Sequence, residues 1–310
     1  MSEKVIETEG LTRRFGQQVA VDDVSLCVIR GDIYGFLGLN GAGKTTTMRM
    51  ILGLLRPSSG RVRLFGGEGE VGRRAAMVRI GAMVENPAFY GHLSGARNLR
   101  LLGSLSGPMT RARVDEVLDL VGLSDAAGKR AYDYSLGMKQ RLAIALALVS
   151  RPELVLLDEP TNGLDPSGIL EMRRLILRLN EEQGVTFVIS SHLLHEIEMV
   201  CNRVGILEAG KLILEKPLVE LMDSVDSNLR LIARPADKVE GVLSRSPATS
   251  VEAVDGGEAW TFQILEPELP ALHRALVAAD VEVYSLARSK MSLEELFLSR
   301  ATPREEGRLS

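Results

Sequence analysis

A glycine-rich stretch that ends in lysine and threonine is the strongest chemical signal in the sequence. It reads Gly38-Leu39-Asn40-Gly41-Ala42-Gly43-Lys44-Thr45, after the apolar run Ile33–Leu37 and before a helix-like segment. Glycines let backbone N–H groups turn inward around phosphates, and the start of a helix adds positive potential. The strand, loop and helix order disfavours the alternative, a glycine-rich turn with a surface lysine. The residues expected to bind a nucleotide are Asn40, Gly41, Ala42, Gly43, Lys44, Thr45 and Thr46.

Within this loop, two side chains have expected roles. Lys44 should reach the β and γ phosphates, and the Thr45 hydroxyl should ligate Mg²⁺.

A second apolar run, Leu154–Leu157, ends in Asp158-Glu159, where a parallel sheet delivers side chains to its ligand. Asp158 would hold Mg²⁺ through water, and Glu159 is the candidate general base for the attacking water. Acidic residues at a strand end are often merely solvated. The phosphate loop is what favours a functional role for these two.

Three further motifs follow along the chain. They are Tyr134-Ser135-Leu136-Gly137-Met138-Lys139-Gln140-Arg141, then Gly163-Leu164-Asp165-Pro166, then His192 after Ser190-Ser191. With the phosphate loop and Asp158-Glu159, this set resembles the ABC ATPase family, in which the three are the signature loop, the D-loop and the switch histidine. The resemblance covers about residues 4–220.

The resemblance implies roles for matching positions. Phe15 matches the aromatic that stacks on adenine, with a core aromatic as the alternative reading. Ser135 and Gly137 would contact the γ-phosphate held by a second copy, so that the site is complete only in a dimer. Asp165 would lie across the dimer interface, and His192 would hold the γ-phosphate and the water in register. Leu136 and Met138 replace the usual glycine and glutamine of the signature loop.

Glu85 is the more unusual departure from the family pattern. It lies in Ile80-Gly81-Ala82-Met83-Val84-Glu85-Asn86-Pro87, where the family usually has a glutamine that links nucleotide to membrane subunits. By resemblance, Glu85 is a hard oxygen ligand near Mg²⁺ with an added negative charge. This variant is similar to the ATPases of bacitracin-resistance and lantibiotic-immunity exporters. In the following segment, Phe89 and Tyr90 either face a membrane subunit or form local core.

Composition narrows the classes of function. The 310 residues carry 37 Lys and Arg against 41 Asp and Glu, so a net charge of −4 gives no global field to attract nucleic acid. Cys27 and Cys201 lie in apolar runs, and we expect reduced core residues. No secretory signal opens the chain, and the longest apolar run, Leu142–Val149, is too short to span a membrane. We expect a peripheral protein on the cytoplasmic face of the membrane.

The positioning elements follow from hydrophobic patterning. Apolar, strand-like runs alternate with helix-like segments, which favours a largely parallel, helix-covered sheet. The expected strands are Val24–Ile29, Ile33–Leu37, Val62–Phe65, Arg79–Val84, Leu154–Leu157, Thr186–Ser190 and Arg203–Glu208, and the expected helices are Thr45–Leu55, Arg111–Val121, Met138–Ser150, Gly168–Glu182 and Leu193–Val200. Gly210-Lys211 predicts a hairpin turn.

Beyond Asn228 the pattern changes. It predicts strands at Leu229–Ala233, Thr249–Val254, Ala259–Ile264 and Val281–Ala287, and helices at Pro235–Ser244 and Pro267–Ala279. The order β-α-β-β-α-β is the ferredoxin-like one. A closing helix is expected from a capping box, Ser292 with Glu295. The predicted domains are therefore 1–220, an ABC ATPase domain, and 221–310, a C-terminal accessory domain.

The fold class is α/β, a P-loop NTPase sheet with an ABC helical subdomain, followed by a small α+β domain. The expected function is ATP hydrolysis that powers export of a drug, a peptide antibiotic or a lipid-like substrate, with ATP and Mg²⁺ as cofactors. The expected partners are a second copy of the chain and integral membrane permease subunits, with no nucleic acid. The alternatives are a soluble ABC ATPase with a cytosolic task, a binding module without turnover, and an importer.

Overall fold

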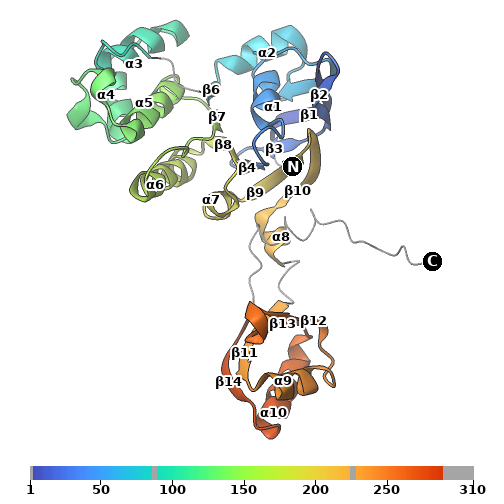
Figure 1. Ribbon diagram of the computed structural model, residues 1–310. Coiled ribbons are helices and arrows are strands. Elements are labelled where there is room, and N and C mark those ends of the chain that lie inside the picture. The colour runs from blue at the N-terminus through green and yellow to red at the C-terminus, as the bar shows by residue number, and fades with distance from the viewer. Residues whose placement is uncertain (1–2, 86–88, 224–227, 289–310) are drawn as a thin grey trace. The chain divides into compact units, whose positions relative to one another are not determined.

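Two compact units make up the chain, Met1–Leu218 and Val219–Ser310 (Figure 1). The structure is a computed structural model that describes residues 3–85, 89–223 and 228–288. Each unit contains its own apolar core. Asn86 and Pro87 of the Glu85 motif, and the closing helix with Ser292 and Glu295, lie outside the described residues.

A six-stranded sheet lies at the centre of the first unit, in the order β10-β9-β4-β8-β7-β6. Neighbouring strands from β9 to β6 are parallel, and β10 is antiparallel to β9. The bounds are β4 Ile33–Leu37, β6 Ile80–Met83, β7 Leu154–Asp158, β8 Thr186–Ser191, β9 Arg203–Glu208 and β10 Lys211–Pro217. Every residue of β4, β7 and β8 is buried, as a sheet covered on both faces requires. The predicted parallel sheet and the hairpin at Gly210-Lys211 are confirmed.

An antiparallel sheet accompanies it, built on β1 Lys4–Phe15, which the sequence analysis did not predict. Its partners are β2 Gln18–Val24, β3 Cys27–Ile29 and β5 Ser59–Leu64. The prediction of one strand over Val24–Ile29 is wrong, because β2 ends at Val24 and β3 begins at Cys27. At this break the Thr8 hydroxyl donates to the Val24 carbonyl at 3.0 Å and accepts from the Leu26 N–H at 2.9 Å.

The structure describes seven α-helices in the first unit, all before residue 200. They are α1 Lys44–Ile51, α2 Gly69–Met77, α3 Gly95–Gly103, α4 Arg111–Leu120, α5 Leu136–Leu148, α6 Pro166–Gln183 and α7 Leu194–Glu198. Helices α3, α4 and α5 pack together as a helical group (Figure 1). Helices α2 and α3 were not predicted from the sequence, and α7 is shorter than the helix predicted over Leu193–Val200. The α6 helix shows why local signals locate helices well, since Pro166 starts it and Gly184, at φ 65°, ends it.

The second unit is a small α+β domain. After α8 Leu218–Asp223 come β11 Asn228–Arg234, α9 Ala236–Leu243, β12 Thr249–Val254, β13 Ala259–Gln263, α10 Leu269–Ala278 and β14 Glu282–Arg288. The sheet is antiparallel, in the order β12-β13-β11-β14. Its core packs Leu231, Trp260 and Phe262 of the sheet against Val239 and Leu276 of the two helices. The predicted element order and the hairpin across Asp255-Gly256-Gly257 are confirmed.

Two sequence expectations concern cysteines and membrane segments. Cys201 is buried, and burial raises the pKa of its thiol, whereas Cys27 is only partly buried. Both are free thiols. Across the ranges that the structure describes, no helix combines the length and the apolar character needed to cross a bilayer.

A cluster of charges holds the amino ends of the central strands. The Arg79 guanidinium, next to β6, donates to both carboxylate oxygens of Glu153, next to β7, at 2.5 and 2.9 Å. Arg30, in the turn before β4, lies 2.7 Å from the same carboxylate. The hydrogen bond from Arg79, followed by the one from Arg30, lowers the pKa of Glu153 from 4.5 to about 2.

We predict that Glu153→Gln lowers stability in a pH-dependent way. Because the folded-state pKa is depressed, the carboxylate stabilises the protein above about pH 4.5 and loses this effect as pH falls towards 2. The side chain is 38% exposed, so the loss near neutral pH should stay below about 1 kcal/mol. Urea unfolding at about pH 7 and pH 3 measures it, with the exposed Glu182→Gln as control. A loss of equal size at both pH values would contradict the assignment.

Candidate active site

The phosphate loop joins β4 to α1 and needs glycine where its backbone turns. Gly41 and Gly43 have φ angles of 84° and 105°, in the region that L-residues rarely adopt. A Cβ on Gly43 would lie 2.5 Å from the Ala20 carbonyl oxygen, so a larger residue would displace the backbone. Gly43 is also the N-cap of α1, which places the helix N-terminus and its free N–H groups at the loop.

Lys44 is buried inside this loop, with 5% of its side chain exposed. Its ammonium group donates to the Gly38 carbonyl at 2.5 Å and to the Leu39 carbonyl at 3.3 Å. It also lies 3.3 Å from Glu159 Oε1. A buried ammonium group requires such partners.

Asp158, at the carboxyl end of β7, connects the loop to the neighbouring strand. The Thr45 hydroxyl donates to Asp158 Oδ2 at 2.7 Å, and the Ser190 hydroxyl of β8 donates to Asp158 Oδ1 at 2.5 Å. Both carboxylate oxygens therefore have hydrogen-bond donors. Ser190 was not among the predicted site residues, although a serine at the end of an apolar strand was the available signal in the sequence.

Glu159 lies between two functional side chains. Its Oε1 faces Lys44, and its Oε2 is 2.8 Å from His192 Nδ1. The backbone holds it at φ 48°, an uncommon conformation for a non-glycine residue that is typical of functional sites. Its N–H is shared by the Ser190 carbonyl and the Ser190 hydroxyl, at 3.2 and 2.9 Å. A carboxylate fixed between a cation and an imidazole can accept a proton from a bound water.

A cavity of about 530 Å³ opens over the phosphate loop, a size that suits a nucleotide. It is lined by Phe15, Gln18, Val19, Ala20, Leu39, Asn40, Gly41, Gly43, Lys44, Thr45, Thr46, Glu159, Ala209 and Gly210. Phe15 is 47% exposed, with the Arg13 guanidinium 4.6 Å from its ring centre, so the core-aromatic alternative is wrong. Ala42 is buried behind the loop.

The signature loop and the D-loop lie elsewhere in the same chain. Ser135 is the N-cap of α5 and accepts from the Met138 N–H, while Asp165 is the N-cap of α6 and accepts from the Gly168 N–H. Ser135, Gly137 and Asp165 are absent from the described residues that line the 530 Å³ cavity. One chain therefore assembles the phosphate loop with Asp158, Glu159 and His192, but not with these three.

A second cavity, of about 510 Å³, lies beside Glu159 and contains Glu85. Its lining residues are Met83, Glu85, Phe89, Leu136, Lys139, Gln140, Asp158, Glu159 and Asn162. Glu159 thus borders both cavities. The Glu85 carboxylate forms an ion pair with Arg49 of α1, a partner that the sequence analysis did not identify because the two lie 36 positions apart in the sequence.

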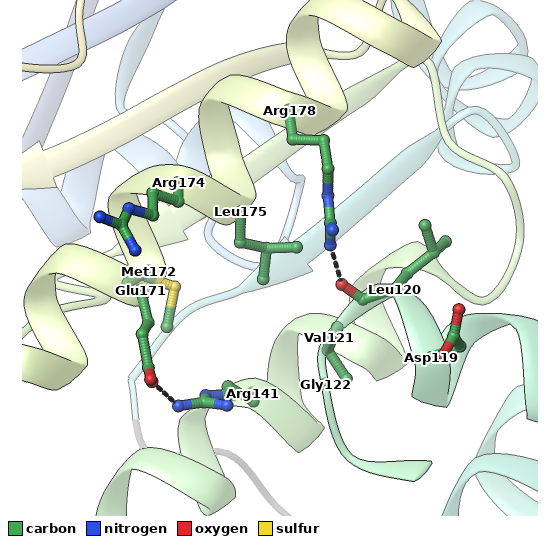
Figure 2. Close-up of a pocket in the computed structure, with 10 residues that line it drawn as sticks. All are labelled: Asp119, Leu120, Val121, Gly122, Arg141, Glu171, Met172, Arg174, Leu175 and Arg178. Carbon is green, nitrogen blue, oxygen red and sulfur yellow. Dashed lines mark hydrogen bonds and ion pairs between the residues drawn. The ribbon is translucent and has the colours of Figure 1, made fainter.

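A third cavity, of about 300 Å³, separates the end of α4 from α6 (Figure 2). Two contacts cross it, an ion pair between Arg141 and Glu171 and a hydrogen bond from Arg178 to the Leu120 carbonyl. Arg178 thereby caps the carboxyl end of α4. No phosphate-loop residue lines this cavity in the described part of the chain, so we assign it to the attachment of the helical group to α6.

The residues at the phosphate loop have the donor chemistry that Mg²⁺ prefers. Thr45 and Asp158 offer a hydroxyl and a carboxylate side by side, both hard oxygen ligands. Within residues 3–85, 89–223 and 228–288, no group of three or more His, Cys, Asp or Glu side chains could hold a metal ion. This donor set suits an ion held by one or two protein groups and by substrate phosphates, which is typical of Mg²⁺.

Fold and site together define an α/β protein of the P-loop nucleotide-binding class, and comparisons with known proteins narrow this class. The ABC transporter family matches residues 21–162. The bacitracin transport ATP-binding protein BcrA of Bacillus licheniformis is 50% identical over 295 residues, 95% of this chain and 96% of that protein. The daunorubicin resistance ATP-binding protein DrrA3 of Streptomyces coeruleorubidus is 33% identical over 305 residues, with 96% of each covered.

Solved structures agree. CbiO1 from Clostridium perfringens, described as part of the ABC transporter complex cbiONQ, has a TM-score of 0.65 at 27% identity, over 79% of this chain and 96% of that one. The ATP-binding cassette MJ0796, a dimer in a post-hydrolysis state with ADP and Pi, has a TM-score of 0.61 at 26% identity, over 69% and 98%. The chain belongs to the ATP-binding proteins of ABC transporters. It is an ATPase that hydrolyses ATP for transport.

We predict that Ser190→Ala slows ATP hydrolysis about tenfold while ATP affinity stays within about threefold. The variant leaves Asp158 Oδ1 without its donor and removes one of two acceptors of the Glu159 N–H, which should misplace both carboxylates. A phosphate-release assay and ATP titration measure these quantities. Ser191→Ala is the matched control, because the hydrogen bonds described for that hydroxyl join it to the backbone of Leu193. Equal rates in the two variants would remove Ser190 from the site.

Proposed function

We propose that the chain binds ATP in the 530 Å³ cavity and hydrolyses it with Glu159 as general base. The observation that carries this assignment is the position of Glu159, between Lys44 and His192 at 3.3 and 2.8 Å. Lys44 would bind the β and γ phosphates and neutralise charge that develops on them. Glu159 would accept the proton of the attacking water, and His192 would orient this water against the γ-phosphate. Phe15 would stack on the adenine.

Thr45 and Asp158 would hold Mg²⁺, with Ser190 fixing the carboxylate of Asp158. The ion, when bound, supplies charge neutralisation at the β and γ phosphate oxygens. Phosphate binding in this site would compete with the hydrogen bonds that Lys44 now makes to Gly38 and Leu39. Lys44 lines this cavity, and phosphate oxygens would replace these carbonyl oxygens as its hydrogen-bond partners.

The active unit would be a dimer of two copies. Ser135, Gly137 and Asp165 do not line the nucleotide cavity of their own chain, which supports a role opposite a second copy. Ser135 would offer a hydroxyl and Gly137 a backbone N–H to the γ-phosphate bound by the partner, and Asp165 would lie at the interface. The dimeric state described for MJ0796 supports this arrangement.

We further propose that ATP hydrolysis powers export of a drug or peptide antibiotic through separate membrane subunits. The relatives named for bacitracin transport and daunorubicin resistance support this substrate class, and CbiO1, part of a transporter complex, supports membrane partners. Such partners would hold the chain at the cytoplasmic face of the membrane. Tyr90, Leu101, Leu105 and Tyr132, in the helical group and its loops, are exposed apolar side chains that such partners would contact.

The proposed domains are an ATPase domain, 1–220, and an accessory domain, 221–310, of ferredoxin-like fold. The support for this fold is the sheet order β14-β11-β13-β12 together with the order β-α-β-β-α-β. None of the described residues that line the 530 Å³ cavity lies in this domain, and we propose that it assists dimerisation or assembly.

We predict that Glu159→Gln keeps ATP binding but slows hydrolysis at least about a hundredfold, since an amide has the same shape but cannot accept the proton. Phosphate release and binding of labelled ATP measure the two effects. Glu181→Gln, an exposed change on α6, is the control and should hydrolyse ATP like the parent. A Glu159→Gln rate within about twofold of the parent would exclude Glu159 as the base.

Removal of residues 223–310 should leave ATP affinity nearly unchanged and weaken dimerisation or membrane-subunit assembly, because the first unit has its own core. ATP titration and sedimentation of both proteins test this expectation. A shortened chain that dimerises and hydrolyses ATP like the full chain would make the accessory domain passive. A shortened chain that no longer binds ATP would mean that the boundary is misplaced.

A further inference from the structure

An ion pair between Arg49 and Glu85 joins helix α1 to the residue that follows strand β6 by two positions. The two side chains are 35% and 59% exposed. Glu85 has a φ of 66°, so its backbone adopts a conformation that is uncommon for glutamate. The Glu85 carboxylate thus follows an uncommon backbone conformation and forms an ion pair with Arg49.

The position of Arg49 places this pair beside the nucleotide site. Arg49 follows Thr45 by four residues in α1, so both side chains lie on the same face of the helix. The Thr45 hydroxyl bonds Asp158, and Asp158 lines the 510 Å³ cavity together with Glu85. One member of the ion pair, Arg49, and one proposed Mg²⁺ ligand, Thr45, thus lie on adjacent turns of one face of α1.

The charges that line the 510 Å³ cavity indicate what the Arg49–Glu85 pair does. Three carboxylates, those of Glu85, Asp158 and Glu159, line the 510 Å³ cavity, and Lys139 is the one cation among its described lining residues. Without a counter-ion, Glu85 would add a negative charge near the phosphates of a bound nucleotide, where like charges repel. A glutamine, usual for the family at this position, would need no such compensation.

We infer that Arg49 is a positioning residue that neutralises Glu85 and holds it beside the nucleotide site. The inference rests on the proposed function, that the phosphate loop and Asp158 bind ATP with Mg²⁺. In this chain the Arg49–Glu85 pair takes the place of a single neutral side chain. Loss of Arg49 should therefore matter only while residue 85 carries a charge.

A double-mutant cycle on the full-length chain tests this dependence. A fluorescent ATP analogue is titrated at several Mg²⁺ concentrations with the parent, Arg49→Met, Glu85→Gln and the double variant. Arg49→Met should weaken binding about three- to tenfold, and the same change in the Glu85→Gln background should alter binding less than about twofold. Arg49→Lys, which keeps the charge, should retain most of the affinity.

Arg56→Met is the matched control for a general loss of positive charge. Arg56 is exposed just after α1, and its side chain makes no ion pair with residues that the structure describes, so its removal should not change binding. Melting temperatures establish that each variant is folded. If Arg49→Met does not fold, Arg49→Lys still allows the test.

Two results would overturn the inference. One is an equal loss on removal of Arg49 in both backgrounds, and the other is no loss in either, which would make the pair an ordinary surface ion pair. Failure of the proposed function has a separate sign. If the parent binds no nucleotide, or if Lys44→Ala binds as well as the parent, the phosphate-loop assignment itself is wrong, and the inference falls with it.

Discussion

The alignment of three parallel strands is the constraint on which the site depends. β4 pairs with β8 so that Leu37 lies beside Ser191, and β8 pairs with β7 so that Ser190 lies beside Asp158. Each strand consequently ends at the same edge of the sheet, with strand spacing near 4.8 Å. The phosphate loop, the acidic pair and His192 begin where those strands end, so hydrogen-bond contact among them follows from register. A slip of one residue would turn Asp158 to the opposite face of the sheet.

Charge compensation explains how this edge can be buried and still remain reactive. Lys44 is nearly inaccessible, and its positive charge is balanced by two carbonyl oxygens and Glu159. Asp158 has a donor on each carboxylate oxygen. Such a site holds its groups in place before the nucleotide arrives, and preorganised charges of this kind are the usual source of electrostatic catalysis. The strained backbone of Glu159 fits the same interpretation, because a residue with positive φ persists only where its surroundings fix it.

The family motifs occupy separate places in the chain, because they lie at the starts of different helices. The signature serine and the D-loop aspartate each cap a helix, α5 and α6, and those helices are held together through contacts such as Arg141 with Glu171. Each side chain accepts a hydrogen bond from an N–H group in the first turn of its helix, which stabilises the helix start at Ser135 and at Asp165. Glu159 borders both the cavity over the phosphate loop and the cavity lined by Leu136 and Gln140 of α5.

The sequence by itself determined the phosphate loop, the acidic pair after β7, the β9–β10 hairpin and the element order of the second unit. Each of these is a local pattern, in which glycines, caps or alternating apolar residues act over a few positions. Only the tertiary structure revealed β1, whose polar residues gain strand conformation by pairing with β2, β3 and β5. It also decided that Ser190 bonds Asp158, that Phe15 is exposed and that Arg49 pairs with Glu85. These contacts join residues far apart in the chain, and a side chain's partner across such a distance is set by strand register and packing, which no local pattern contains.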